Sequence, residues 1–134
     1  MDHDILSDAA AQRHLEEVFR WDDLDTRATW IFLSGRLNHR IATDPLFRPE
    51  LVTVEITENQ RNHVANNGTE QWKIDRLDEA HRDAPILIAV MPSGMATIID
   101  GNHRILRRWR DGLRDVQGYL LPFDMWHPLY GWRL

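Results

Sequence analysis

Residues 85–121, which decide the fold, read PILIAVMPSGMATIIDGNHRILRRWRDGLRDVQGYLL. The segment opens with a continuous apolar run, residues 85–90, which is typical of a central strand. Turn-forming residues follow at 92–94, and a second apolar run covers residues 95–99. Two apolar runs separated by a short turn predict a β-hairpin.

The second half of this segment predicts a helix and then a strand. The helix covers residues 102–111 and ends near Gly112, since glycine is the residue that most often follows a helix. The strand covers residues 116–121. The predicted order is therefore strand, strand, helix, strand.

The junction between the second strand and the helix, Asp100 to Arg104, has the chemistry of an anion site. Gly101 permits a tight turn and close approach by a ligand, and Asn102 is a favoured helix cap. The first amides of a helix and its dipole attract anions. His103 and Arg104 add donors, and Asp100 can hold Mg²⁺ or orient the turn. These residues predict a phosphate-binding turn; the alternative is a plain capped turn.

The predicted helix has two opposed faces at 100° per residue. The apolar face carries Ile105, Leu106 and Trp109. The basic face carries His103, Arg104, Arg107 and Arg108. The first face is expected in the core, and the second is expected either to meet an anionic ligand or to be solvated.

The sequence before this segment predicts further elements. Residues 51–56 alternate and are β-branched, which predicts a strand. Residues 59–70 are polar and predict a loop, and residues 72–83 predict an amphipathic helix. The aromatic tail, residues 123–134, is expected to pack across the domain, with stacking on a base as the alternative.

Residues 1–50 are expected to form a helical extension. Helical spacing of apolar residues predicts one helix over residues 7–20 and a second over residues 25–42. Within the second, the cluster Trp30 to Leu33 is also compatible with a strand.

Composition limits the classes of protein. The 134 residues fit one domain, with 43% apolar and 28% charged residues. The absence of cysteine excludes disulfides and thiolate chemistry. No apolar run is long enough to span a membrane, and the acidic N-terminus has no apolar signal core, so a cytoplasmic protein is expected. A net charge of −5 argues against autonomous DNA binding.

Residues 85–121 resemble the core of the ParB/sulfiredoxin superfamily, in which a glycine-containing turn between strand and helix binds nucleotide phosphates. Here the turn reads Asp-Gly-Asn-His-Arg and is most similar to the Asp-Gly-His-His-Arg of ADP-dependent serine kinases. Asn102 stands where sulfiredoxins have their reactive cysteine, which excludes sulfinic-acid reduction. The resemblance implies a single α+β domain with a small mixed sheet, whose core covers residues 51–134.

The resemblance also implies a function, either as a small-molecule kinase or as an NTPase. The cofactors would be ADP or ATP, or another NTP, with Mg²⁺ at Asp100, and the partner an unknown small-molecule acceptor. Residues 101–104 would cradle the phosphates, and Arg104 with His103 would stabilise charge on the transferred group. Glu58 is the candidate general base, and a plain loop carboxylate is the alternative there.

The main alternative function is a non-catalytic, ParB-like regulatory or DNA-associated module. It would use a basic stripe formed by Arg104, Arg107, Arg108 and Arg110. The negative net charge of the chain disfavours DNA as its partner.

Overall fold

A computed structural model describes residues 15–66 and 71–134 of the chain. These residues fall into two compact units, which are described separately. One unit covers Glu50–Leu121, and the other combines residues up to Pro49 with Pro122–Leu134. Among the described residues, no helix is long and apolar enough to cross a membrane.

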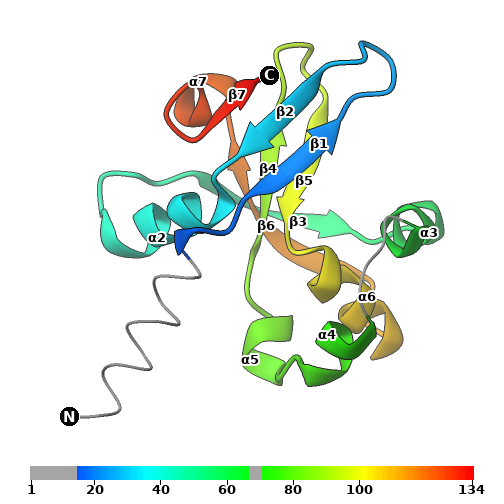
Figure 1. The fold of residues 1–134 in the computed structure, drawn as a ribbon. Helices are drawn as coiled ribbons and strands as arrows, with labels where there is room; N and C mark the ends of the chain where they lie inside the picture. Colours follow the sequence, from blue (N-terminus) through cyan, green and yellow to red (C-terminus); the bar gives the residue numbers. More distant parts are fainter. Residues whose placement is uncertain (1–14, 67–70) are drawn as a thin grey trace. The chain divides into compact units, whose positions relative to one another are not determined.

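The unit Glu50–Leu121 is built on a four-stranded mixed sheet (Figure 1). Its strands are β3 (Glu50–Glu55), β4 (Ile86–Val90), β5 (Ala96–Asp100) and β6 (Asp115–Leu121). The spatial order is β3-β6-β4-β5. Strand β6 is antiparallel to β3 and parallel to β4, and β4 is antiparallel to β5. The predicted hairpin, helix and strand of residues 85–121 are all present.

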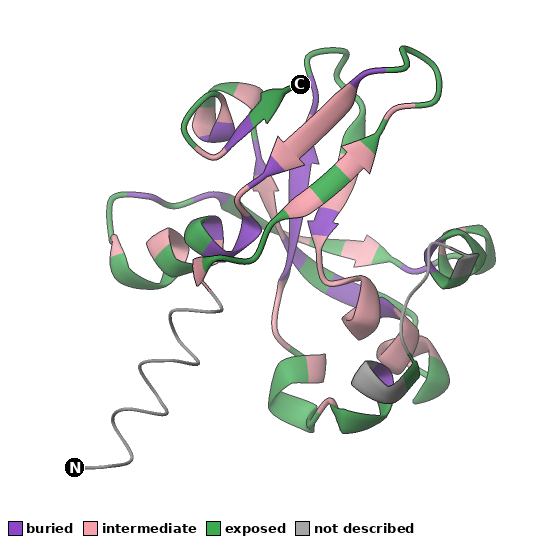
Figure 2. Ribbon diagram, in the orientation of Figure 1, coloured by how far each residue is buried: buried purple, intermediate pink, exposed green. Residues whose placement is uncertain are grey.

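The described residues of this unit also form the helices α3 (Glu58–Asn66), α4 (Gln71–Arg76), α5 (Glu79–Arg82) and α6 (Asn102–Arg110). Helices α3, α4 and α5 each pack against α6 (Figure 1). The buried core combines residues of β3–α3, β4, α6 and β6 (Figure 2). Its buried members are Ile56, Val64, Ile86, Ile88, Ile105 and Val116. Side chains at these positions place α3 and α6 on one face of the sheet.

The second unit contains a three-stranded antiparallel sheet in the order β1-β2-β7. The strands are β1 (Phe19–Asp22), β2 (Thr29–Phe32) and β7 (Gly131–Arg133). The same unit contains helices α2 (Ser34–Thr43) and α7 (Phe123–Trp126). Trp126 is fully buried. Its ring lies 4.8 Å from that of Phe32 and 5.7 Å from that of Trp30, measured between centroids. The expected packing role of the aromatic tail is therefore confirmed for Trp126.

The α+β class with a small mixed sheet is confirmed, but the helical extension is only partly so. Residues 7–14 of the first predicted helix lie outside the described residues, and the end of that prediction, Phe19 and Arg20, is strand β1. The second predicted helix is strand β2 followed by α2. Residues 29–32 are extended because they pair with strands on both sides. The aromatic tail was predicted to belong to the same core as residues 51–121, but Pro122–Leu134 lies in the unit that contains β1 and β2.

Two predictions between β3 and β4 were also wrong. Residues 58–66 form helix α3 where a loop was predicted, with Val64 buried against the core. The single helix predicted over residues 72–83 is two short helices, α4 and α5. Asp78 separates them, because its carboxylate accepts a hydrogen bond from the backbone N–H of His81 at 2.8 Å and so caps α5.

Candidate functional site

The predicted phosphate-binding turn lies at the junction of β5 and α6. Asp100 is the last residue of β5, and Gly101 is the N-cap of α6 with φ +116° and ψ 12°. The Gly101 carbonyl accepts the first helical hydrogen bond, from the N–H of Ile105, at 3.1 Å. Asn102 was predicted to be the cap, but it is the first helical residue, and no side chain caps this end.

Gly101 is required here for two physical reasons. Its positive φ is a conformation that residues with a Cβ rarely adopt. A Cβ at this position would also lie 2.2 Å from Cγ2 of Ile86 on β4. The side chain of Ile86, on the neighbouring strand, is therefore what lies close to the Gly101 backbone. This contact accounts for a glycine at position 101 without the predicted close approach of a ligand.

Arg104 connects the first turn of α6 to the segment before β4. Its Nη1 donates to the carbonyl of Pro85 at 2.8 Å, and its Nη2 lies 3.6 Å from Oδ2 of Asp100. The Arg104 side chain is 17% exposed and the Asp100 side chain 21% exposed. This pair therefore holds the turn together and is partly shielded from water.

His103 and Glu58 occupy different environments. Nε2 of His103 is buried, so this nitrogen does not face solvent. Glu58 is exposed at the first position of α3, where the positive end of the helix dipole stabilises its negative charge. The structure brings together Asp100, Gly101 and Arg104, and it places Glu58 at the start of α3.

The predicted basic stripe on α6 is largely engaged with the protein itself. Arg107 donates to the carbonyls of Ile74 at 3.1 Å and Leu77 at 2.8 Å, and pairs with Asp111 at 2.9 Å. Arg110 pairs with Asp75. Hydrogen bonds from Arg107 and then Arg82 hold the pKa of Asp111 below its usual value. These arginines stabilise the packing of α4 and α5 on α6.

The described ranges, 15–66 and 71–134, contain no group of three or more His, Asp or Glu side chains arranged to hold a metal ion. Asp100 is the one carboxylate of the turn, and it is paired with Arg104. A Mg²⁺ ion bound together with a nucleotide needs only one or two protein carboxylates, because phosphate and water supply the other ligands. Asp100 therefore fits a Mg²⁺ site that is completed by a nucleotide phosphate, and it does not form a Mg²⁺ site without one.

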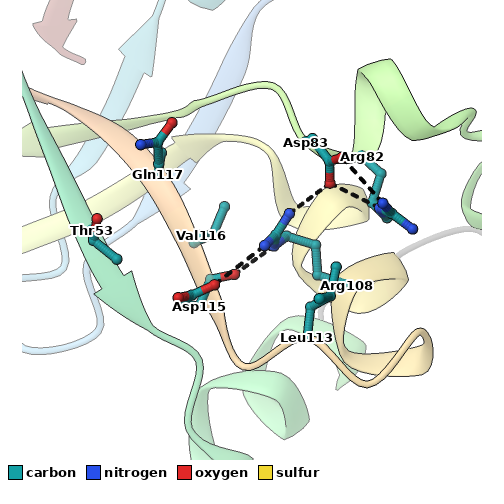
Figure 3. Close-up of a pocket in the computed structure, with 8 residues that line it drawn as sticks. All are labelled: Thr53, Arg82, Asp83, Arg108, Leu113, Asp115, Val116 and Gln117. Atoms are coloured by element: carbon teal, nitrogen blue, oxygen red, sulfur yellow. Dashed lines mark hydrogen bonds and ion pairs between the residues drawn. The ribbon is translucent and has the colours of Figure 1, made fainter.

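A pocket that sequence reasoning missed lies near the other end of α6 (Figure 3). Its volume is about 430 Å³. It is lined by Thr53, Arg82, Asp83, Arg108, Leu113, Asp115, Val116 and Gln117. These residues come from four separated parts of the sequence and form no local motif. Only the predicted alternation of the strands could have indicated that some of them share a face.

Comparisons with known proteins give no further assignment of the site. No protein-family profile, no curated protein and no solved structure matches the chain.

Proposed function

We propose that the chain is a nucleotide-binding domain of the ParB/sulfiredoxin-like type that carries out phosphoryl chemistry, as a small-molecule kinase or an NTPase. The nucleotide is ADP, ATP or another NTP, and its phosphates bind at the N-terminus of α6. A cytoplasmic location is part of the proposal, and the absence of cysteine agrees with a reducing compartment.

One observation carries the proposal, namely the strand–glycine–helix junction itself. Strand β5 ends at Asp100, Gly101 turns the chain with a positive φ, and α6 begins directly afterwards. The first turn of α6 contains His103 and Arg104 and no acidic residue, so nothing acidic within it opposes an incoming anion. The first amides of a helix have no partner within that helix, and they attract phosphate.

Each residue of the turn has a role in this proposal. The backbone of Gly101 to Arg104 cradles the phosphates, and Arg104 supplies positive charge beside them. Mg²⁺, held by Asp100 together with phosphate oxygens, would neutralise charge on the nucleotide. Arg104 is already oriented by the Pro85 carbonyl, so its guanidinium loses little freedom when it meets a phosphate. Glu58 is the general base of this proposal.

The alternative, a DNA-associated module, receives less support from the contacts of α6. Arg107, Arg108 and Arg110 each form ion pairs with carboxylates of the same unit. DNA would have to compete with these pairs, and the chain has a net charge of −5.

The test is a thermal-shift screen with ADP, ATP, CTP and GTP in the presence of Mg²⁺, on the wild type and on Asn102→Asp. A ligand that binds the native state raises the midpoint by mass action. The substituted aspartate places a negative charge at the helix N-terminus, where it stabilises the free protein but repels phosphate. We expect one nucleotide to raise the midpoint of the wild type and to lose most of this effect in the variant.

The matched control is Ser93→Asp, which adds the same charge in the β4–β5 turn. Ser93 lies beyond the opposite end of β5 from Gly101, so the full strand separates the two sites. In Ser93→Asp, the nucleotide should raise the unfolding midpoint as much as it does in the wild type. An equal response in Asn102→Asp would show that the turn is not the phosphate site. No response to any nucleotide by the folded wild type would overturn the proposal, and salt-sensitive binding of duplex DNA instead would favour the alternative.

A further inference from the structure

The pocket in Figure 3 is formed entirely within the unit Glu50–Leu121. One wall is the paired β3 and β6, where Thr53 lies opposite Gln117 in the register. The other wall is the end of α5 and the last turns of α6. A volume of about 430 Å³ falls within the range of roughly 300–1,000 Å³ that is usual for small-ligand pockets.

The charges that line this pocket are paired with one another. Arg108 is 12% exposed and bridges two carboxylates, with Nη1 2.8 Å from Asp83 and Nη2 3.3 Å from Asp115 (Figure 3). Arg82 contacts the same Asp83 at 2.9 Å. Two arginines thus face two aspartates, and the lining has no net charge. A charged ligand would meet charges of both signs in this lining, so the lining favours neither an anion nor a cation.

The same lining keeps hydrogen-bonding capacity after these pairs are formed. Arg108 uses three of its five N–H groups, on Asp83 and Asp115. The side-chain amide of Gln117 and the hydroxyl of Thr53 also line the pocket, both at exposed positions, and each can donate and accept. Asp83 and Asp115 are 50% and 63% exposed, so their carboxylates remain accessible as acceptors. The lining therefore offers both hydrogen-bond donors and acceptors.

The apolar part of the lining is small. Leu113 and Val116 contribute it, between the polar side chains. A suitable ligand is uncharged, has several groups that both donate and accept, and has carbon-bound hydrogens to lie on the two aliphatic residues. Hydroxyl groups on adjacent carbons meet this description, because each can donate to a carboxylate and accept from a guanidinium or an amide.

We propose that this pocket binds an uncharged polyhydroxyl compound, either a free sugar or polyol or the sugar of a nucleoside. Asp115, Arg108 and Gln117 bind the hydroxyl groups, and Thr53 contributes one more contact. The proposal does not rest on phosphate binding at the turn, because the ligand needs no phosphate. Arg104 and Arg108 are one helical turn apart on α6, so the two sites are neighbours within one unit.

The test is a titration of ¹⁵N-labelled protein with D-glucose, D-ribose and myo-inositol as free polyhydroxyl probes, and with adenosine for the nucleoside source. We expect saturable shifts of the amide signals of Thr53, Arg108 and Gln117 with the free probes, with adenosine or with both. Cyclohexanol, acetate and methylammonium are the controls for a single hydroxyl and for either charge. If one of these shifts the same signals equally, or if no polyhydroxyl probe does, the proposal is wrong.

Two variants locate the contacts without altering the ion pairs. Thr53→Val and Gln117→Met remove one polar group each at exposed positions, and each should weaken binding roughly three- to tenfold. Thr97→Val on β5 and Gln60→Met on α3 make the same changes outside the pocket and should bind like the wild type. Binding unchanged in both pocket variants would overturn the assignment. For the nucleoside, 2′,3′-dideoxyadenosine must bind more weakly than adenosine.

Discussion

At the scale of single residues, Gly101 combines two constraints that are usually met separately. Its backbone has a positive φ, and the space in front of its Cα is filled by Ile86 of the neighbouring strand. The glycines at the other turns differ, because Gly94 and Gly112 also have positive φ but face open space. A substitution at Gly94 therefore shows the cost of backbone strain without any steric overlap.

We expect Gly101→Ala to lower the free energy of unfolding by about 3 kcal/mol or more, through backbone strain and overlap with Ile86. Gly94→Ala should lower it by only about 1 kcal/mol, since strain acts there without overlap. Urea denaturation of the two variants beside the wild type gives both values. Equal losses would mean that the contact with Ile86 has no energetic weight.

The sequence identified the residues of the turn but not their partners. The glycine, the adjoining strand and the start of the helix were predicted from local chemistry, which depends on neighbouring residues only. That Asn102 would not be the cap, and that Arg104 would bind the carbonyl of Pro85, could not be predicted. Both depend on the angle at which α6 leaves the sheet, which is set by packing.

At the scale of elements, α6 is anchored by charges on its outer face. Arg107 is bonded to carbonyls at the end of α4, and Asp111 accepts from both Arg107 and Arg82. The opposed faces of this helix were predicted correctly, but its arginines were expected to meet a ligand or water. The acidic partners lie in α4, α5 and the loops beside them, too far along the sequence for a helical wheel to relate them.

These ion pairs make stability depend on acid pH. The pKa of Asp111 is lowered, by Arg107 and Arg82, and that of Asp75 is lowered by Gln71 and Arg110. A carboxyl group whose pKa is lower in the folded state stabilises the protein above its unfolded pKa, about 4 for aspartate. We expect the urea midpoint to fall as the pH drops below about 4, and to fall less steeply in Asp111→Asn.

The elements that were predicted correctly are those with strong local patterns. The β4–β5 hairpin, β3, β6 and α6 combine regular periodicity with a turn or a glycine at their ends. Helix α3 was missed because most of its residues are polar and, among residues 58–65, whose burial is described, only Val64 is buried against the core. For β2 the sequence left helix and strand both open, because an apolar cluster of four residues is too short for periodicity to decide between them.

At the scale of the whole molecule, the described residues form two units, and one of them combines residues 15–49 with Pro122–Leu134. Strand β7 has three residues and pairs with β2, which lies near the other end of the sequence. Such a short strand has no periodicity that sequence analysis can detect. The core of this unit is aromatic, with Trp126 packed against Trp30, Phe32 and Phe123.

We expect Trp126→Ala to lower the free energy of unfolding by about 3–5 kcal/mol, because it removes a fully buried indole. Trp132→Ala, on β7 of the same unit, should cost far less, since that side chain is 38% exposed. Thermal unfolding followed by far-UV circular dichroism compares the two variants. A similar loss in both would contradict the assignment of Trp126 as the centre of this core.

The position of β6 between β3 and β4 has a consequence for the order of events during synthesis. The ribosome makes β3 and β4 first, but neither can pair with the other, because the strand that joins them is made last of the four. The β4–β5 hairpin can form at once, whereas β3 must wait with an unpaired edge until residue 121 has emerged. Unpaired strand edges promote aggregation, so the nascent chain is most vulnerable during this interval. Slow translation between β5 and β6 would lengthen that interval, and a chain released before β6 would keep β3 without a partner.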